Sequence, residues 1–239
     1  MFKWTDKSIE LWKRAEKYTN HYKNLCKELI PYVDLNDDIY DIGCGLGFID
    51  LELSPYVKSI RSFDIEKRVL EELDKSAKDK GIVNISTSSF NWTKEEDNCC
   101  DVLLACSFGN LVECFDDFIR MARDKVIIVK RHKPKMSNKY VKGKAAFSAL
   151  ASEQYLIERG ISYKKISFQS EFGQPLDSYS EAIDFVKFHG MNRGVPEDEF
   201  LKENLLSGKK YGYKYYLPNK KDMVIFIITK ESLSFEKRK

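Results

Sequence analysis

Three glycines and one later carboxylate form the pattern in this chain with the most chemical content. Gly43, Gly45 and Gly47 follow an expected strand that ends at Ile42, and Asp64 stands at the end of the next expected strand. Glycines in such a turn let backbone N–H groups approach a ligand closely, and the helix that follows directs its positive end to the same place. A carboxylate roughly 20 residues on, at a strand tip, can accept both ribose hydroxyls. The pattern predicts a site for a nucleoside-containing cofactor.

The spacing of the glycines distinguishes between cofactors. A dinucleotide-binding turn has the form G-x-G-x-x-G, and its third glycine would fall where this chain has Phe48. Here glycine instead recurs at every second position, preceded by Asp41. This arrangement resembles the first motif of the class I S-adenosylmethionine-dependent methyltransferases, and Asp64 matches that family's ribose-binding acid. The resemblance covers about residues 25–131, with a family-like ending to about residue 230. A glycine turn in some other Rossmann-like protein is the alternative.

The resemblance implies a set of cofactor-binding residues. The glycines would wrap the methionine part of S-adenosylmethionine, Asp41 would orient the turn or meet an amine, and Ile65 would contact one face of adenine. Asp64 has the alternative role of a helix N-cap, with Glu66 as the other acid nearby. The expected set is Asp41, Gly43, Cys44, Gly45, Gly47, Asp64, Ile65, Asn91, Trp92, Ala105 and Cys106.

The loop after the third expected strand is the place where this family contacts the adenine edge. Asn91 offers both a donor and an acceptor there. Phe90 or Trp92 can cover the face of the base. Many relatives have aspartate in place of Asn91, and Trp92 has the alternative of being packed in the core.

The loop after the fourth expected strand, residues 105–110, would lie beside the reacting sulfonium. It lacks the Asn-Pro-Pro-Tyr pattern of enzymes that methylate exocyclic amines of bases or glutamine amides. Cys106 has the position of a covalent nucleophile, but Ala105 precedes it where such enzymes have proline or threonine. Since free cysteine is among the most buried residue types, a structural Cys106 is favoured.

A basic segment follows the fifth expected strand. Residues 130–144 contain seven lysines and arginines and no acid. The segment could attract an anionic substrate or RNA phosphates, or it could be a solvated loop. His132 is the histidine placed to reach the site and is the weak candidate for a general base.

Composition indicates a single globular domain of ordinary character. The chain has 239 residues, 43% of them hydrophobic, and a net charge of +3, which is too small to require a nucleic-acid or membrane partner. Its six cysteines form no C-x-x-C pair and it has three histidines, so structural zinc is not expected. The N-terminus shows no apolar signal region, which favours a cytoplasmic location with reduced thiols. The oligomeric state is left open.

The order of elements predicts an α/β fold. Short apolar runs alternate with amphipathic segments, as expected of a parallel, doubly wound sheet. By resemblance, the sheet has seven mostly parallel strands with an antiparallel last strand. We expect an N-terminal helical cap over residues 1–37 with a helix at 6–32, a cofactor-binding half at 38–131, and a substrate-side half at 132–239 with a helical insertion at about 173–210. Expected strands are 38–42, 59–63, 83–88, 101–105, 125–129 and 162–172, with a last strand at 223–229.

The insertion is rich in aromatic residues, which suits a cover over a small, partly apolar acceptor or a local core. We therefore interpret the chain as a methyltransferase that acts on a small molecule by SN2 displacement. A tRNA or rRNA methyltransferase using the basic segment is the first alternative. A cofactor-binding scaffold without catalysis is the second.

Overall fold

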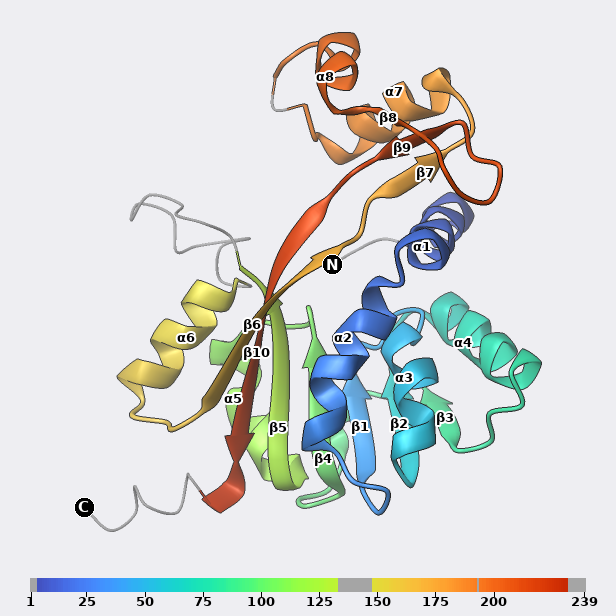
Figure 1. The fold of residues 1–239 in the computed structure, drawn as a ribbon. Coiled ribbons are helices and arrows are strands. Elements are labelled where there is room, and N and C mark those ends of the chain that lie inside the picture. The colour runs from blue at the N-terminus through green and yellow to red at the C-terminus, as the bar shows by residue number, and fades with distance from the viewer. Residues whose placement is uncertain (1–3, 133–147, 193, 232–239) are drawn as a thin grey trace. The chain divides into compact units, whose positions relative to one another are not determined.

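A computed structural model describes residues 4–132, 148–192 and 194–231 (Figure 1). Most of the predicted basic segment, from residue 133 onward, lies outside the described residues. The described chain divides into two compact units. The smaller contains residues up to His21 together with Ser170–Lys221, and the larger contains Tyr22–Gln169 and the chain from Asp222. The organisation of the whole chain as one domain stays a prediction.

The larger unit is built on a seven-stranded sheet with the order β3-β2-β1-β4-β5-β10-β6. The pairs β1–β2, β1–β4, β2–β3 and β4–β5 are parallel, whereas β10 is antiparallel to β5. The predicted fold class, a mostly parallel sheet with an antiparallel last strand, is confirmed. The strands are β1 (Asp38–Ile42), β2 (Ser59–Phe63), β3 (Ile85–Ser88), β4 (Cys100–Cys106), β5 (Ala122–Arg131), β6 (Lys164–Glu171) and β10 (Lys220–Thr229).

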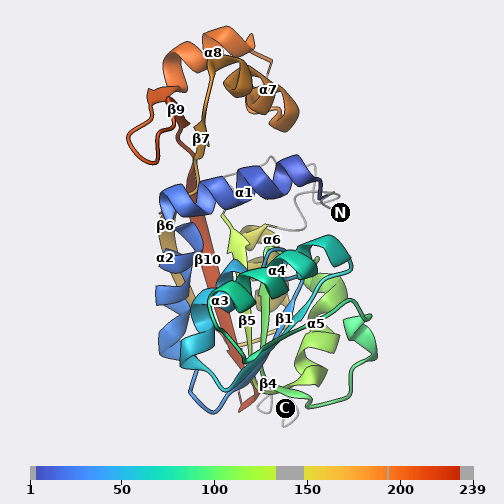
Figure 2. The same cartoon turned by 90° about the vertical axis from the view of Figure 1, so that its right-hand side faces the viewer.

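Helices cover both faces of this sheet, as the alternation of apolar side chains along β5 requires. Val126 and Ile128 share one buried cluster with α5 and α6, whereas Ile127 and Val129 share another with α2 and α3 (Figure 2). The outer helix α4 packs on α3 and β3. These helices are α2 (His21–Leu29), α3 (Phe48–Leu53), α4 (Lys67–Asp79), α5 (Leu111–Met121) and α6 (Ala149–Glu158).

The parallel register brings the predicted site segments to one edge of the sheet. Ile42 pairs with Phe63 at the ends of β1 and β2, and Cys106 pairs with Val129 at the ends of β4 and β5. The glycine turn, Asp64 and the loops after β3 and β4 all follow carboxyl ends of parallel strands. In open α/β sheets this edge is where ligands bind.

The predicted helix over residues 6–32 is broken, and the single-helix expectation is wrong. The structure has α1 (Asp6–Thr19), then α2, then a short 3-10 turn over Ile30–Tyr32. Asn20 between α1 and α2 has φ of 54°, the left-handed conformation that ends helices and that asparagine tolerates better than most residues.

The smaller unit combines α1 with the segment between β6 and β10. The predicted helical insertion contains two helices, and Ser178 Oγ accepts a hydrogen bond from Glu181 N at the start of the first. A three-stranded antiparallel sheet, β7-β9-β8, was not predicted. Tyr179, Phe185 and Tyr215 pack around a small buried core in this unit. Whether the insertion also covers an acceptor stays a prediction. These elements are β7 (Gln174–Leu176), α7 (Tyr179–His189), α8 (Glu197–Asn204), β8 (Leu206–Ser207) and β9 (Tyr215–Leu217).

No helix in the described part of the chain combines the length and the apolar character needed to span a bilayer.

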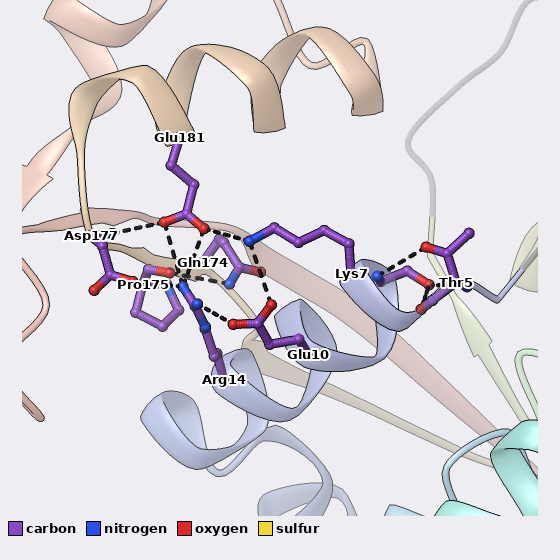
Figure 3. A network of polar contacts seen from close by, with 9 residues as sticks. Thr5, Lys7, Glu10, Arg14, Gln174, Pro175, Asp177 and Glu181 are labelled. Atoms are coloured by element: carbon purple, nitrogen blue, oxygen red, sulfur yellow. Dashed lines mark hydrogen bonds and ion pairs between the residues drawn. The ribbon is translucent and has the colours of Figure 1, made fainter.

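Glu181 joins α1 to the insertion within the smaller unit (Figure 3). Its carboxylate accepts hydrogen bonds from Lys7 Nζ at 2.8 Å, Arg14 Nη1 at 3.2 Å and Asp177 N at 2.8 Å. Burial alone would raise the pKa of Glu181, but the Asp177 N–H and the two cations hold it below its usual value. Both Glu181 and Arg14 have side chains only 17% exposed, so this contact is worth more than a surface ion pair.

We predict that Glu181→Ala loosens α1. The substitution leaves the Asp177 N–H without its acceptor and removes one of the three carboxylates that Arg14 contacts, the others being Glu10 and Asp177. This loss costs about 1–3 kcal/mol. Hydrogen exchange of the α1 amides should therefore become faster, while exchange in β1 and β4 stays unchanged. Glu181→Gln keeps an acceptor for Asp177 and should give a smaller effect; equal exchange in all three proteins contradicts the prediction.

Candidate functional site

The glycine turn is folded back on the end of β2 by backbone hydrogen bonds. Gly43 N and Cys44 N both donate to the Phe63 carbonyl, at 2.8 and 3.0 Å, and Gly47 N donates to Cys44 O at 3.0 Å. The three glycines have φ values of 77°, 55° and 62°, in the left-handed region that favours glycine. The turn therefore has a defined shape before any ligand binds.

Two of these glycines are also required by close packing. A Cβ added to Gly43 would lie 2.0 Å from the Phe108 ring, and one added to Gly47 would lie 2.4 Å from Leu73. Phe108 comes from the loop after β4, so its ring rests directly on the turn. The loop after β4, where we expect the acceptor, is thus in contact with the glycine turn, where we expect the cofactor.

Asp64 is connected to the turn by its side chain. Its Oδ2 accepts from Gly45 N and its Oδ1 accepts from Glu66 N, each at 3.0 Å. A carboxylate oxygen can accept two hydrogen bonds, so each oxygen keeps capacity for a hydroxyl. The N-cap alternative is not realised, because the N-cap residue of α4 is Glu66 and no described side chain caps this helix. Asp64 can therefore shape the turn and still bind a ribose.

Exposed apolar side chains lie at the ends of β2 and β3. Ile65 is 60% exposed and Phe90 is 55% exposed, which is high for residues of this size. Both follow carboxyl ends of neighbouring strands. They offer two apolar surfaces for a flat base.

The other two residues expected around adenine, Asn91 and Trp92, make hydrogen bonds or packing contacts within the protein itself. Asn91 Oδ1 accepts from Thr93 N and Thr93 Oγ1, so it caps the 3-10 turn over Trp92–Lys94. Trp92 is only partly exposed and packs against Phe108 and Phe118 with ring centroids 6.1 and 5.4 Å apart. The packed alternative for Trp92 is observed, and cofactor contacts of Asn91 and Trp92 stay predictions.

Asp41 and Asp50 are buried together beneath the turn. Asp41 is 2% exposed and Asp50, from α3, is fully buried, with Ser62 Oγ donating to Asp50 Oδ2 at 2.6 Å. Burial raises the pKa of both carboxyls, and the Asp50 charge raises that of Asp41 further. Asp50 was not among the predicted site residues. The feature of the sequence that could have indicated it is an acidic residue among the apolar residues of the segment Phe48–Leu53.

Lys130 is not part of an exposed basic loop, which corrects its place in the segment 130–144. It lies in β5, is 1% exposed, and its Nζ donates to the carbonyls of Phe108 and Gly109, the latter at 2.7 Å. Burial lowers the pKa of Lys130 to about 8. Ser107 and Gly109 have positive φ, so the ammonium fixes a loop of unusual backbone shape.

The remaining predicted residues do not converge on one point. The Ala105 side chain belongs to the buried core, and Cys106 packs partly against the opposite core cluster, so either could meet a cofactor mainly through its backbone. Cys44 Sγ lies 3.6 Å from Gly45 O. His132 is exposed, its backbone N donates to Asp222 O at 2.7 Å, and its role as a base stays a prediction.

Solved structures of similar fold include several methyltransferases. A methyltransferase candidate of Bacillus halodurans aligns with a TM-score of 0.57 and 13% identity over 87% of this chain and 98% of that one. An RNA methyltransferase candidate of Pyrococcus horikoshii gives 0.52 and 10% over 88% and 84%. The precorrin-6y C5,15-methyltransferase of Geobacter metallireducens gives 0.51 and 11% over 86% and 87%. No protein-family model and no curated protein sequence matches the chain.

The chain has the Rossmann-like fold of the class I methyltransferases. At these identities the likeness concerns the fold. In this chain the glycine turn after β1, the acid after β2 and the loop after β4 share one edge of the sheet. Within residues 4–132, 148–192 and 194–231, no group of three or more His, Cys, Asp or Glu side chains is placed to hold a metal ion.

We predict that Lys130→Met loosens the loop after β4. Methionine fills the space but leaves the carbonyls of Phe108 and Gly109 without their donor. Hydrogen exchange over residues 107–110 should become faster, whereas exchange in the core strands should not change.

The pH dependence of stability provides a second readout for Lys130. The pKa of Lys130 is about 8 in the folded chain and 10.5 for a lysine exposed to water, so between these limits the unfolded chain binds more protons. The free energy of unfolding should therefore gain up to about 1.4 kcal/mol per pH unit from this group as pH rises through that range. Lys130→Met should lack this contribution. An identical pH profile in the variant contradicts the burial of a titrating ammonium.

Proposed function

We propose that this chain is an S-adenosylmethionine-dependent methyltransferase that acts on a small molecule. The observation that carries the proposal is the Asp64 carboxylate, which is held against Gly45 N at the end of β2 and keeps capacity to accept ribose hydroxyls. This placement serves a nucleoside whose remaining part lies along the glycine turn.

The residues present fit this cofactor in three respects. Gly43, Gly45 and Gly47 have the positive φ values of a tight turn, which directs the backbone toward the place where the methionine part would lie. Ile65 and Phe90 expose apolar surface at neighbouring strand ends, which suits adenine. The third glycine of a dinucleotide motif is replaced by Phe48, the first residue of α3.

The chemistry asks little of the protein beyond alignment. When bound, the cofactor would supply a methyl carbon that its sulfonium makes electrophilic, and the thioether of S-adenosylhomocysteine would be a good leaving group. The chain's residues must hold the acceptor in line and exclude water. Phe108, held against the turn by Lys130, provides an apolar wall at this place. A thiolate or phenolate acceptor needs no base; for a hydroxyl or amine acceptor, His132 is our proposal.

A small acceptor is favoured over RNA by charge. The net charge is +3, and Lys130 is withdrawn from the basic segment by burial. Transfer of a labelled methyl group to metabolite pools and to RNA pools separates the two substrate classes. Cofactor binding without transfer to either pool supports the scaffold alternative.

We predict that the purified protein binds S-adenosylmethionine and S-adenosylhomocysteine but not NAD. The physical reason is that Phe48, the first residue of α3, stands where a dinucleotide-binding motif has its third glycine, which lets the helix pack closely on the strand. Isothermal titration calorimetry with the three ligands measures this directly. Binding of NAD without binding of either sulfur-containing nucleoside overturns the proposed function.

We predict that Asp64→Ala weakens cofactor binding by about 1–3 kcal/mol, roughly 5- to 150-fold. The ribose hydroxyls lose a charged acceptor, and Gly45 N loses the bond that shapes the turn. The fold should persist because Asp64 is partly exposed at a strand end. Glu66→Ala is the matched control and should bind normally. The reverse order of effects would assign the ribose acid to Glu66.

A further inference from the structure

Two acidic side chains lie beneath the glycine turn, and no basic side chain in the described part of the chain is paired with them. Asp41 and Asp50 are within hydrogen-bonding reach of each other. Two ionised carboxylates cannot bond to one another, because neither carries a donor. A hydrogen bond between them therefore requires one proton.

The hydrogen-bond pattern around the pair agrees with a shared proton. Ser62 Oγ satisfies Asp50 Oδ2, whereas Asp41 Oδ1 and Asp50 Oδ1 have no donor among the described residues. The ionisable groups that face Asp41 from the neighbouring elements are Asp50 of α3, Asp64 after β2 and Cys44 of the turn, all acidic. A proton between the two carboxyls satisfies both orphaned oxygens and lowers the charge of the buried pair from −2 to −1.

We propose that Asp41 and Asp50 share one proton, and that a cationic cofactor bound at the turn displaces it to solvent. The second part rests on the proposed function. Burial and like charge favour the protonated pair, whereas a positive ligand charge nearby favours the ionised pair. Binding and proton release are then linked, so cofactor affinity rises with pH by up to about tenfold per pH unit while the pair titrates.

The linkage distinguishes the cofactor from its product. S-adenosylmethionine carries a sulfonium charge that S-adenosylhomocysteine lacks, so the former should release more of the shared proton. Asp50 acts here as a positioning residue, because it reaches the ligand through Asp41 and the turn. Its effect is a preference for the charged cofactor that increases with pH.

The first experiment tests the shared proton in the unliganded wild-type protein. Infrared spectroscopy near neutral pH should show the band of a protonated carboxyl, shifted in D2O. In Asp50→Asn this band should disappear, because the amide N–H replaces the proton toward Asp41 while the amide oxygen still accepts from Ser62. Absence of a protonated carboxyl in the wild type overturns the proposal, whether or not the variant folds.

The second experiment tests the linkage. Each ligand is titrated calorimetrically in two buffers of different ionisation enthalpy, using wild type and Asp50→Asn. We expect the wild type to release up to about one proton per S-adenosylmethionine bound, and less with S-adenosylhomocysteine. Titration of the ligand's own amine is common to both proteins and cancels in their difference. The variant should lack the excess release.

The outcomes separate the two proposals. If the wild type binds S-adenosylmethionine with no more proton release than Asp50→Asn, the linkage is wrong although the proposed function stands. If neither ligand binds the wild type, the proposed function fails and the linkage fails with it, while the infrared measurement still decides whether the pair shares a proton.

Discussion

The Phe63 carbonyl is the contact on which the site depends. It accepts hydrogen bonds from both Gly43 N and Cys44 N, and so fixes where the chain leaves β1 and where it turns toward α3. Asp64, the next residue along, then reaches Gly45 N with its carboxylate. The end of β2 thus positions both the turn and the acid, and this is possible only because β1 and β2 pair in parallel with Ile42 opposite Phe63.

Much of the sheet was predictable because its strands are buried on both faces. The central strands β4 and β5 contain the continuous apolar runs Val102–Ala105 and Val126–Val129, and the predicted ranges 38–42 and 59–63 coincide with β1 and β2, which are followed directly by glycine and aspartate. The break at Asn20 was missed because a single residue in the left-handed conformation leaves the apolar periodicity on either side intact. The sheet β7-β9-β8 was missed because strands as short as Leu206–Ser207 have no periodicity of their own.

The part of the site that is formed by residues close together in the sequence could be predicted. The part that depends on contacts between distant residues could not. The glycines and Asp64 form one contiguous pattern. Lys130 was assigned to a solvated basic segment because its neighbours in the chain are basic, whereas its partners are carbonyls about 20 residues earlier. Phe108 resting on Gly43 and Asp50 meeting Asp41 are likewise visible only in three dimensions.

At the carboxyl edge of the sheet, buried ionisable side chains stabilise the irregular backbone of the site. The loop after β4 has two residues of positive φ, and its carbonyls cannot be satisfied by a regular ladder. An apolar residue at position 130 would avoid the desolvation cost of an ammonium but leave two carbonyls without a donor. Under our proposal the same balance holds beneath the turn, where a shared proton lets Asp41 and Asp50 stay buried although no basic side chain among the described residues faces them. The two arrangements meet at the Phe108–Gly43 contact, so a change at Lys130 or Asp50 should be felt at the turn.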